Sequence, residues 1–119
     1  MAYLMLVLEN ADRRDARAPG QGRSECERMA AFAESLHARG VLVAAESLKS
    51  LRDGTRVGKP ADKAASLRDG PFAEAKEIVG GFFLLDVADR EQALAIAAEC
   101  PAAEWSTLEV REVGPCYTD

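Results

Sequence analysis

The chain has 119 residues, of which 48% are hydrophobic and 29% charged, as in a globular protein that is large enough to bury a core. Its 15 Lys and Arg against 20 Asp and Glu give a net charge of −5, which argues against nucleic acid and anionic membranes as partners. A short apolar start, three cysteines without a CxxC motif and one histidine predict a reduced, cytoplasmic protein without a metal, cofactor or membrane segment.

The chain opens with a predicted strand and a polar loop. Residues 2–8 are almost continuously apolar, which is typical of a strand that is covered on both faces. The following loop, residues 10–23, is rich in arginine, with Arg13, Arg14, Arg17 and Arg23. These arginines either clamp an anionic substrate or belong to a solvated loop, and the aspartates between them favour the solvated loop.

A helix and a second strand follow. The capping-box spacing of Ser24 and Glu27 predicts a helix start, and Gly40 is a natural residue to end the helix. Residues 41–46 then form an apolar strand that ends in a carboxylate. The expected inner face of the helix consists of Cys26, Met29, Ala33 and Leu36.

The middle of the chain predicts a hairpin. Its short strands lie at residues 55–57 and 65–68, and a loop over residues 58–63 joins them. The returning strand leads into Asp69-Gly70-Pro71, a rigid turn in which proline presets φ and a carboxylate is fixed at a tight bend.

The last third of the chain predicts a strand, a helix and a strand. Residues 78–87 are the strongest strand, and Asp89 with Gln92 forms a second capping box for a helix that Pro101 stops. Residues 107–113 alternate between apolar and charged side chains, as in a half-exposed strand. The expected inner face of the second helix consists of Ala93, Leu94, Ala97 and Ala98.

This order of elements, β-α-β, hairpin and β-α-β, predicts an α+β fold over a single domain, residues 1–119. It is the order of the ferredoxin-like plait, with both helices on one face of an antiparallel sheet. Phe82-Phe83-Leu84-Leu85 places large apolar side chains on both faces, and helices cover only one of them. We therefore expect a homodimer that pairs sheet to sheet as a dimeric α/β barrel, the alternative being a longer loop folded over the second face.

One segment carries a family resemblance. Residues 69–77 read Asp-Gly-Pro-Phe-Ala-Glu-Ala-Lys-Glu and are followed by Gly80, Gly81 and an apolar strand. This pattern resembles the DGPF-type (DGPFAETKE) branch of the YCII-related proteins, with Ala75 in place of threonine. The resemblance extends over nearly the whole chain and implies a dimeric ferredoxin-like α/β barrel.

The resemblance also implies a range of activities. Some YCII-like proteins resemble dimeric barrel enzymes such as muconolactone isomerases and cofactor-free monooxygenases, and a His-Asp pair is the catalytic pair proposed in the better-studied branch. Asp69 matches the aspartate, whereas the helix position that matches the histidine is apolar, near Met29, and the histidine of this chain is His37. Some DGPF-type proteins are linked to extracytoplasmic-function sigma factors, which implies a regulatory role as an alternative.

The candidate catalytic residues are Asp69, Glu46 and Lys76. Asp69 is either a general base in a pocket or a turn former that accepts local hydrogen bonds, and the turn former is favoured. Glu46 ends an apolar strand, so its carboxylate is either paired for structural reasons or lies at a wet cavity mouth. Lys76 is expected to act as an electrostatic stabiliser.

The expected ligand-binding residues, with the two phenylalanines as walls, are Gly70, Pro71, Phe72, Glu74, Glu77 and Phe82. Glu74, Lys76 and Glu77 form either a coupled acid–base cluster or a solvated ion-pair network, and the network is favoured. Gly80 and Gly81 either let a ligand or a partner backbone approach closely or mark a β-bulge, which is favoured.

The sequence thus predicts a homodimeric small-molecule-binding protein or cofactor-free enzyme, with acid–base carboxylates in a pocket near Asp69-Gly70-Pro71-Phe72. The expected partners are a second copy of the chain and a small organic ligand. The alternative is a non-catalytic interaction or regulatory module.

Overall fold

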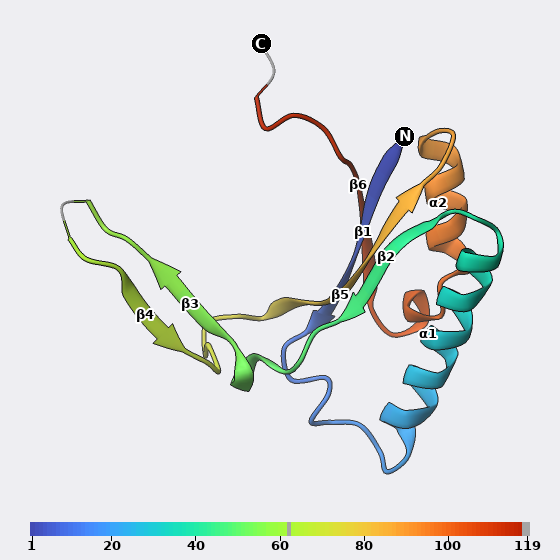
Figure 1. Cartoon of the computed structure of the whole chain (residues 1–119). Coiled ribbons are helices and arrows are strands. Elements are labelled where there is room, and N and C mark those ends of the chain that lie inside the picture. The colour runs from blue at the N-terminus through green and yellow to red at the C-terminus, as the bar shows by residue number, and fades with distance from the viewer. Residues whose placement is uncertain (62, 118–119) are drawn as a thin grey trace.

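In the computed structural model, which describes residues 1–61 and 63–117, the chain folds as two helices packed on an antiparallel sheet (Figure 1). Residue 62 of the predicted loop and residues 118–119 of the expected domain lie outside the described residues. The elements are β1 Ala2–Asn10, α1 Gln21–Ala38, β2 Leu42–Ser47, β3 Thr55–Gly58, β4 Ser66–Asp69, β5 Glu77–Asp86, α2 Arg90–Glu99 and β6 Thr107–Glu112, with 3-10 turns at Leu51–Asp53 and Pro101–Glu104.

The described strands form two separate sheets. The main sheet has four strands in the order β2-β5-β1-β6, and each neighbouring pair is antiparallel. This order, with both helices on one side, confirms the predicted α+β class and is consistent with a ferredoxin-like fold. The sheet is not closed. The second sheet is the β3–β4 hairpin, which reaches away from the body of the molecule (Figure 1).

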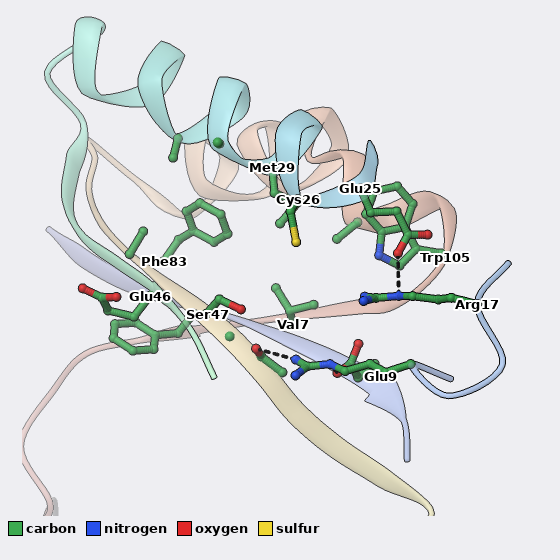
Figure 2. Close-up of a pocket in the computed structure, with 18 residues that line it drawn as sticks. Val7, Glu9, Arg17, Glu25, Cys26, Met29, Glu46, Ser47, Phe83 and Trp105 are labelled. Carbon is green, nitrogen blue, oxygen red and sulfur yellow. Dashed lines mark hydrogen bonds and ion pairs between the residues drawn. The ribbon is translucent and has the colours of Figure 1, made fainter. Parts of the chain in front are cut away.

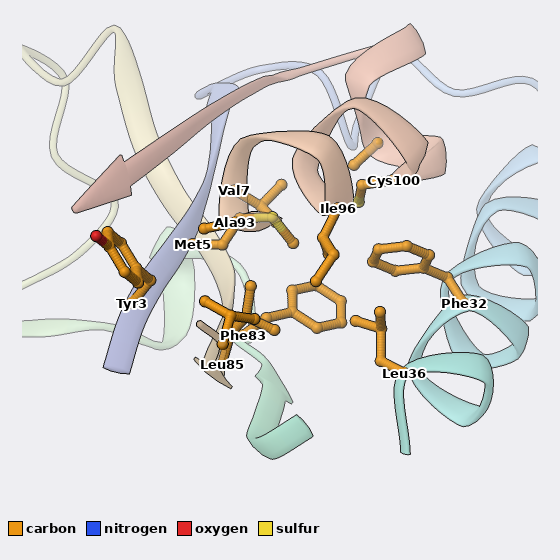
Figure 3. Packing of buried hydrophobic residues seen from close by; sticks show 12 residues of the cluster. Tyr3, Met5, Val7, Phe32, Leu36, Phe83, Leu85, Ala93, Ile96 and Cys100 are labelled. Carbon is orange, nitrogen blue, oxygen red and sulfur yellow. The ribbon is translucent and has the colours of Figure 1, made fainter. Parts of the chain in front are cut away.

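The core lies between the main sheet and the helices, as Figure 3 shows. Alternate residues of β1 and β5 point towards the helices, because successive side chains of a strand face opposite ways. Phe32 of α1 meets Phe83 of β5 edge to face, with ring centroids 5.5 Å apart. The buried cluster consists of Tyr3, Met5, Val7, Phe32, Leu36, Phe83, Leu85, Val87, Ala93, Ile96, Cys100 and Ala102.

The opposite face of the sheet is apolar as well. Leu4 and Leu6 of β1 lie opposite Leu84 and Phe82 of β5, so the four side chains share this face, where they are half-buried. Both helices lie on the other side (Figure 1). The apolar character of both faces is therefore as the sequence indicates, and the dimeric barrel stays a prediction.

The chain is less compact than a lone domain of its size. Its radius of gyration is 16.4 Å, against about 13.5 Å for a compact chain of this length. Its accessible surface is 8127 Å², against about 6,300 Å² for a compact protein of this mass. The molecule is flat, with extents of 49 × 48 × 18 Å, because a single helical layer covers the sheet and the hairpin extends beyond it.

Three details of the helices differ from the sequence expectation. Helix α1 begins at Gln21 rather than at Ser24, because Gly20 takes a left-handed conformation with φ of 81° and the Gln21 side chain accepts a hydrogen bond from the Ala18 amide. Cys26 is exposed although its side chain is on the predicted inner face, because it lines a cavity between α1 and the sheet. In α2 the predicted cap is confirmed, since Asp89 accepts from the Gln92 amide. Its inner face, however, carries Ala93 and Ile96, whereas Leu94 and Ala98 point outward.

Candidate functional site

A cavity of about 290 Å³ lies between the N-terminal half of α1 and the main sheet (Figure 2). Its α1 wall carries the short side chains of Cys26, Ala30 and Ala33, and Gly80 and Gly81 of β5 line it from the sheet. Space remains between helix and sheet because small residues meet there. The full lining consists of Val7, Glu9, Arg14, Arg17, Glu25, Cys26, Met29, Ala30, Ala33, Ala45, Glu46, Ser47, Gly80, Gly81, Phe82, Phe83, Ala102 and Trp105.

The two glycines of β5 are required by close approaches. The register between β1 and β5 shifts between Val7 and Leu8, which leaves Gly80 as an extra residue and confirms the predicted bulge. A Cβ atom on Gly80 would lie 2.7 Å from Glu9 Oε1, and one on Gly81 would lie 2.9 Å from the Glu46 carbonyl oxygen. The bulge therefore makes room for a carboxylate in the lining of the cavity.

That carboxylate belongs to Glu9, which is only 5% exposed and is held by Arg14. Arg14 Nε donates to Glu9 Oε1 at 2.6 Å, and the same guanidinium donates to the carbonyl oxygens of Leu48, at 2.7 Å, and Gly80, at 3.2 Å. One arginine therefore joins β1, β5 and the chain that leaves β2. A buried carboxylate requires such a partner, because an isolated charge is strongly disfavoured away from water.

A second buried carboxylate, Glu25 of α1, forms ion pairs with two further arginines. Arg13 Nη2 and Gln21 Nε2 donate to its Oε2 oxygen, and Arg17 Nε lies 3.1 Å from its Oε1 oxygen. The hydrogen bond from Arg13 is the main reason why the pKa of Glu25 lies below its ordinary value. Glu25 is therefore a carboxylate that stays ionised.

The arginine loop is accordingly folded inward. The side chains of Arg13, Arg14 and Arg17 are mostly buried, so the favoured interpretation of a solvated loop is wrong for them. It holds for Arg23, whose side chain is 87% exposed beside Glu27. The loop turns inward because Glu9 and Glu25 are carboxylates on core-facing positions that the arginines neutralise.

The only tryptophan of the chain, Trp105, forms the outer wall on this side. The guanidinium carbons of Arg13 and Arg28 each lie 5.4 Å from the centre of its ring, which is the geometry of a cation–π contact. The cavity thus has a polar end, formed by Trp105, Arg17 and Glu25, and an apolar end that includes Met29 and Phe83 (Figure 2).

The sequence-predicted site residues are divided among three places. Glu46 and Phe82 line the cavity. Lys76 and Glu77 line a second, more open groove, of which Trp105 is also a part. The remaining predicted residues line neither of these hollows and lie at the base of the hairpin: Asp69, Gly70, Pro71, Phe72 and Glu74.

The hairpin base is held together by its own contacts. Asp69 accepts a hydrogen bond of 2.8 Å from the Thr55 hydroxyl across the two strands. Phe72 is buried beneath Arg56 and Arg68, whose guanidinium carbons lie 4.0 and 5.1 Å from the ring centre. These two arginines also pair with Glu74. The ion-pair network therefore differs from the predicted one, because Glu74 pairs with Arg56 and Arg68 and not with Lys76.

A glycine is needed at the same place, because a Cβ atom on Gly70 would overlap the Leu51 carbonyl oxygen. The Asp-Gly-Pro-Phe segment therefore fastens the hairpin to the chain that follows β2. The catalytic and ligand-binding roles of its residues stay predictions.

Glu9 and Glu25 are absent from the sequence-predicted site, although the sequence holds a signal for both carboxylates. Arg14 and Arg17 enter the sequence analysis only through the less favoured alternative of a clamp for an anionic substrate. Glu9 continues the alternation of buried Tyr3, Met5 and Val7, so a charge stands in phase with core residues. Glu25 likewise precedes Phe32 by two helical turns on the buried face of α1. A charged residue in phase with an apolar stripe indicates a buried ion pair or a polar site.

Two features are absent from the described residues. Residues 1–61 and 63–117 contain no group of three or more His, Cys, Asp or Glu side chains arranged to hold a metal ion. In the same part of the chain, no helix is both long enough and apolar enough to cross a bilayer.

A comparison with models of protein families finds one family that matches nearly the whole chain. The family model described as the YCII-related domain matches residues 1–116, which include the sheet, both helices, the hairpin and the cavity. No curated protein matches the chain.

Proposed function

The chain belongs to the YCII-related family, and on that premise we propose that it binds a small organic molecule in the cavity between α1 and the sheet. The observation that carries the proposal is the mixed lining of this cavity. Apolar side chains such as Met29 and Phe83 form one part, and the buried ion pairs of Glu9 and Glu25 form another. Binding sites for small molecules have this composition, a mostly apolar wall with a few fixed polar groups.

The size of the cavity also supports a small ligand. Its volume of about 290 Å³ lies at the lower end of the range of about 300–1,000 Å³ that is typical of ligand sites. The same ion pairs that line it are held by several hydrogen bonds, so the polar groups are in place before a ligand arrives. Preorganised groups lower the entropy cost of binding.

Binding is better supported than acid–base catalysis. Glu9 and Glu25 are both engaged by arginines, and the pKa of Glu25 is lowered by the hydrogen bond from Arg13, which suits a structural or electrostatic role more than proton transfer. Glu46 is the exposed carboxylate of the lining and is the proton acceptor in the enzymatic version of the proposal. That version requires no cofactor.

We also propose that two copies of the chain form a homodimer through the open faces of their main sheets. The excess of about 1,800 Å² over the surface of a compact protein of this mass exceeds the roughly 800 Å² that each partner buries in a stable interface. Leu6 and Phe82 lie opposite each other at the centre of that apolar face. Pairing sheet to sheet would give the dimeric barrel. The sequence of residues 69–77 separately supports the proposal that the chain belongs to the DGPF branch of the family.

The hairpin supports an intermolecular contact of its own. Val57 and Leu67 are register partners on β3 and β4, and they are 67% and 70% exposed. Apolar side chains that point into solvent from an extended arm are typical of interfaces. In the homodimer the arm contacts the second copy, whereas in the regulatory alternative it contacts a different protein.

A ligand screen with a cavity-filling variant tests the binding proposal. Thermal shift and Trp105 fluorescence are recorded against a library of small organic acids, amides and alcohols. Ala33→Phe, which fills the cavity from α1, should abolish the shifts, whereas Ala31→Phe, at an exposed position of the same helix, should leave them unchanged. Equal responses of both variants, or no response of the wild-type chain, would contradict the proposal.

A further inference from the structure

We propose that the ligand of the cavity is a small organic anion, a monocarboxylate with an apolar body, and that its head group binds beside Arg17. The inference rests on the proposed function and adds the chemical class of the ligand and the residue that selects it. It follows from the charges around Glu25, from the unused donors of Arg17 and from the apolar residues of the lining.

The buried charges of the polar end do not balance. The guanidinium groups of Arg13, Arg14 and Arg17 face the carboxylates of Glu9 and Glu25, which leaves one positive charge in excess. Arg13 contributes to this excess through Glu25 and is not itself part of the cavity lining. The donors of Arg14 are engaged by Glu9 and by the carbonyl oxygens of Leu48 and Gly80. The excess therefore lies with the two arginines that share Glu25. A bound anion would neutralise it in a place where water is largely excluded.

Arg17 has the donors that such an anion needs. Within the described part of the chain its side chain pairs with Glu25 through Nε alone, at 3.1 Å, and the two terminal nitrogens are left for another acceptor. Figure 2 shows the side chain extending from the loop so that these nitrogens enter the cavity. The Nε atom of Arg17 and the Oε1 atom of Glu25 are both buried and lie 3.1 Å apart, yet neither makes a hydrogen bond in the described residues. The ion pair with Glu25 therefore does not use the full hydrogen-bonding capacity of this guanidinium.

The local sequence gives Arg17 this position. A Cβ atom on Gly22 would lie 3.1 Å from Arg17 Nη1, so the absence of a side chain on the first turn of α1 lets the guanidinium lie against the helix. A planar guanidinium with two free donors matches a carboxylate, which it binds through two parallel hydrogen bonds.

The other parts of the lining restrict the rest of the ligand. Val7, Met29 and Phe83 form an apolar part of the same lining, so the body of the anion is apolar. Glu46 also belongs to the lining, but it is the register partner of Phe82, so its side chain points to the open face of the sheet and away from α1. A single negative charge on the ligand matches the one positive charge in excess beside Glu25.

Matched probes test the charge preference. Benzoate and its neutral isostere benzamide have the same ring and nearly the same volume, and both are titrated at constant ionic strength. Trp105 fluorescence reports occupancy, and protection of the Cys26 thiol from a disulfide reagent reports it independently. The thiol assay uses a Cys116→Ser background, because Cys26 and Cys116 are exposed and Cys100 is buried. Benzoate should bind at least about tenfold more tightly, the factor expected for charge-assisted hydrogen bonds.

Variants of Arg17 assign the preference to one residue. Arg17→Gln should weaken benzoate binding about tenfold or more and leave benzamide binding unchanged, and Arg17→Lys should recover part of the loss. Arg23→Gln removes an exposed arginine of the same segment and should change neither ligand. Glu25→Gln leaves the excess charge larger and should strengthen benzoate binding. Circular dichroism and the melting temperature show whether each variant is folded.

The possible outcomes separate the two proposals. Equal affinities for benzoate and benzamide, or a benzoate affinity that Arg17→Gln leaves intact, would overturn this inference while the cavity remains a binding site. A cavity that takes up neither these probes nor any compound of the wider library would overturn both.

Discussion

The carboxylate of Glu9 lies 2.6 Å from Arg14 Nε, and both side chains line the cavity. Glu9 stands where the alternation of β1 would place an apolar core residue, and Arg14 returns from the following loop to neutralise it. The pair also ties the end of β2 to β5 through Leu48 and Gly80. The shape of the cavity and the stability of the sheet therefore depend on the same interaction.

Removal of Arg14 should destabilise the protein strongly. Arg14→Met leaves the Glu9 carboxylate buried without its partner, which typically costs about 3–5 kcal/mol of the free energy of unfolding. Urea denaturation measures the loss. The double variant Glu9→Leu with Arg14→Met should recover most of it, because two apolar side chains leave no buried charge.

The control for this pair is Arg52→Met, since Arg52 pairs with Asp15 where both side chains are largely exposed. Its cost should be about 1 kcal/mol or less. A similar cost for Arg14→Met would show that the buried pair contributes no more than a surface one.

An alanine at position 80 tests the bulge. The added Cβ atom would lie 2.7 Å from Glu9 Oε1 and 3.1 Å from Arg14 Nη2, so the ion pair has to move. We expect Gly80→Ala to lower the free energy of unfolding by about 1–3 kcal/mol, as overpacking does. Gly58→Ala is the matched control, because a Cβ atom there meets nothing within 4 Å. Equal midpoints of urea denaturation for the two variants would contradict the prediction.

The stability of the protein should fall at acidic pH, in part through Glu25. Its pKa is lower in the folded state than its ordinary value, so the folded state binds the proton less tightly than the unfolded chain. The stabilisation from this group is complete above the ordinary pKa of glutamate. It is lost as the pH falls through the depressed pKa of the folded state.

Glu74 and Glu104, whose pKa values are lowered by hydrogen bonds from Arg68 and Arg28, act in the same direction but are exposed. The contribution of Glu25 is therefore measured as the difference in the free energy of unfolding between wild type and Glu25→Gln, from urea denaturation at a series of acidic pH values. Parallel curves for the two proteins would argue against a depressed pKa of Glu25.

A charge at the centre of the open sheet face tests the homodimer. Leu6→Lys should shift the mass measured by light scattering from twice the chain mass of 12.8 kDa towards one chain mass at micromolar concentration. Leu94→Lys is the control, because Leu94 is an exposed leucine of α2 on the helical side of the molecule. A wild-type protein that behaves as a single 12.8 kDa chain under these conditions would contradict the homodimer.

The fold is largely predictable from the sequence because its signals are local. Alternation, helical spacing, the Asp89 cap and Pro101 place the elements, and their order limits the topology to a ferredoxin-like arrangement. The start of α1 is misplaced, since the capping-box pattern at Ser24 lies inside the helix and the actual start depends on Gly20 and on the Gln21 side chain. Helix ends depend on such competing contacts.

The cavity is less predictable because its polar groups come together from distant segments. Arg17 and Glu25 are close in sequence, but nothing local shows that the loop between β1 and α1 folds under the helix. The most distinctive motif, Asp69-Gly70-Pro71-Phe72, predicts a site at the hairpin base instead. A rigid turn followed by charged residues has the same sequence pattern when it binds a ligand as when it only joins two strands.

The base of the hairpin is held together by its own contacts, so changes in the length of the hairpin should be tolerated. The β3–β4 sheet is separate from the main sheet, and the cluster of Phe72 with Arg56, Arg68 and Glu74 anchors the arm at its root. The arm can therefore be lengthened, shortened or exchanged beyond that root without repacking the layer between helices and sheet. Among related chains, we expect insertions and deletions to concentrate there.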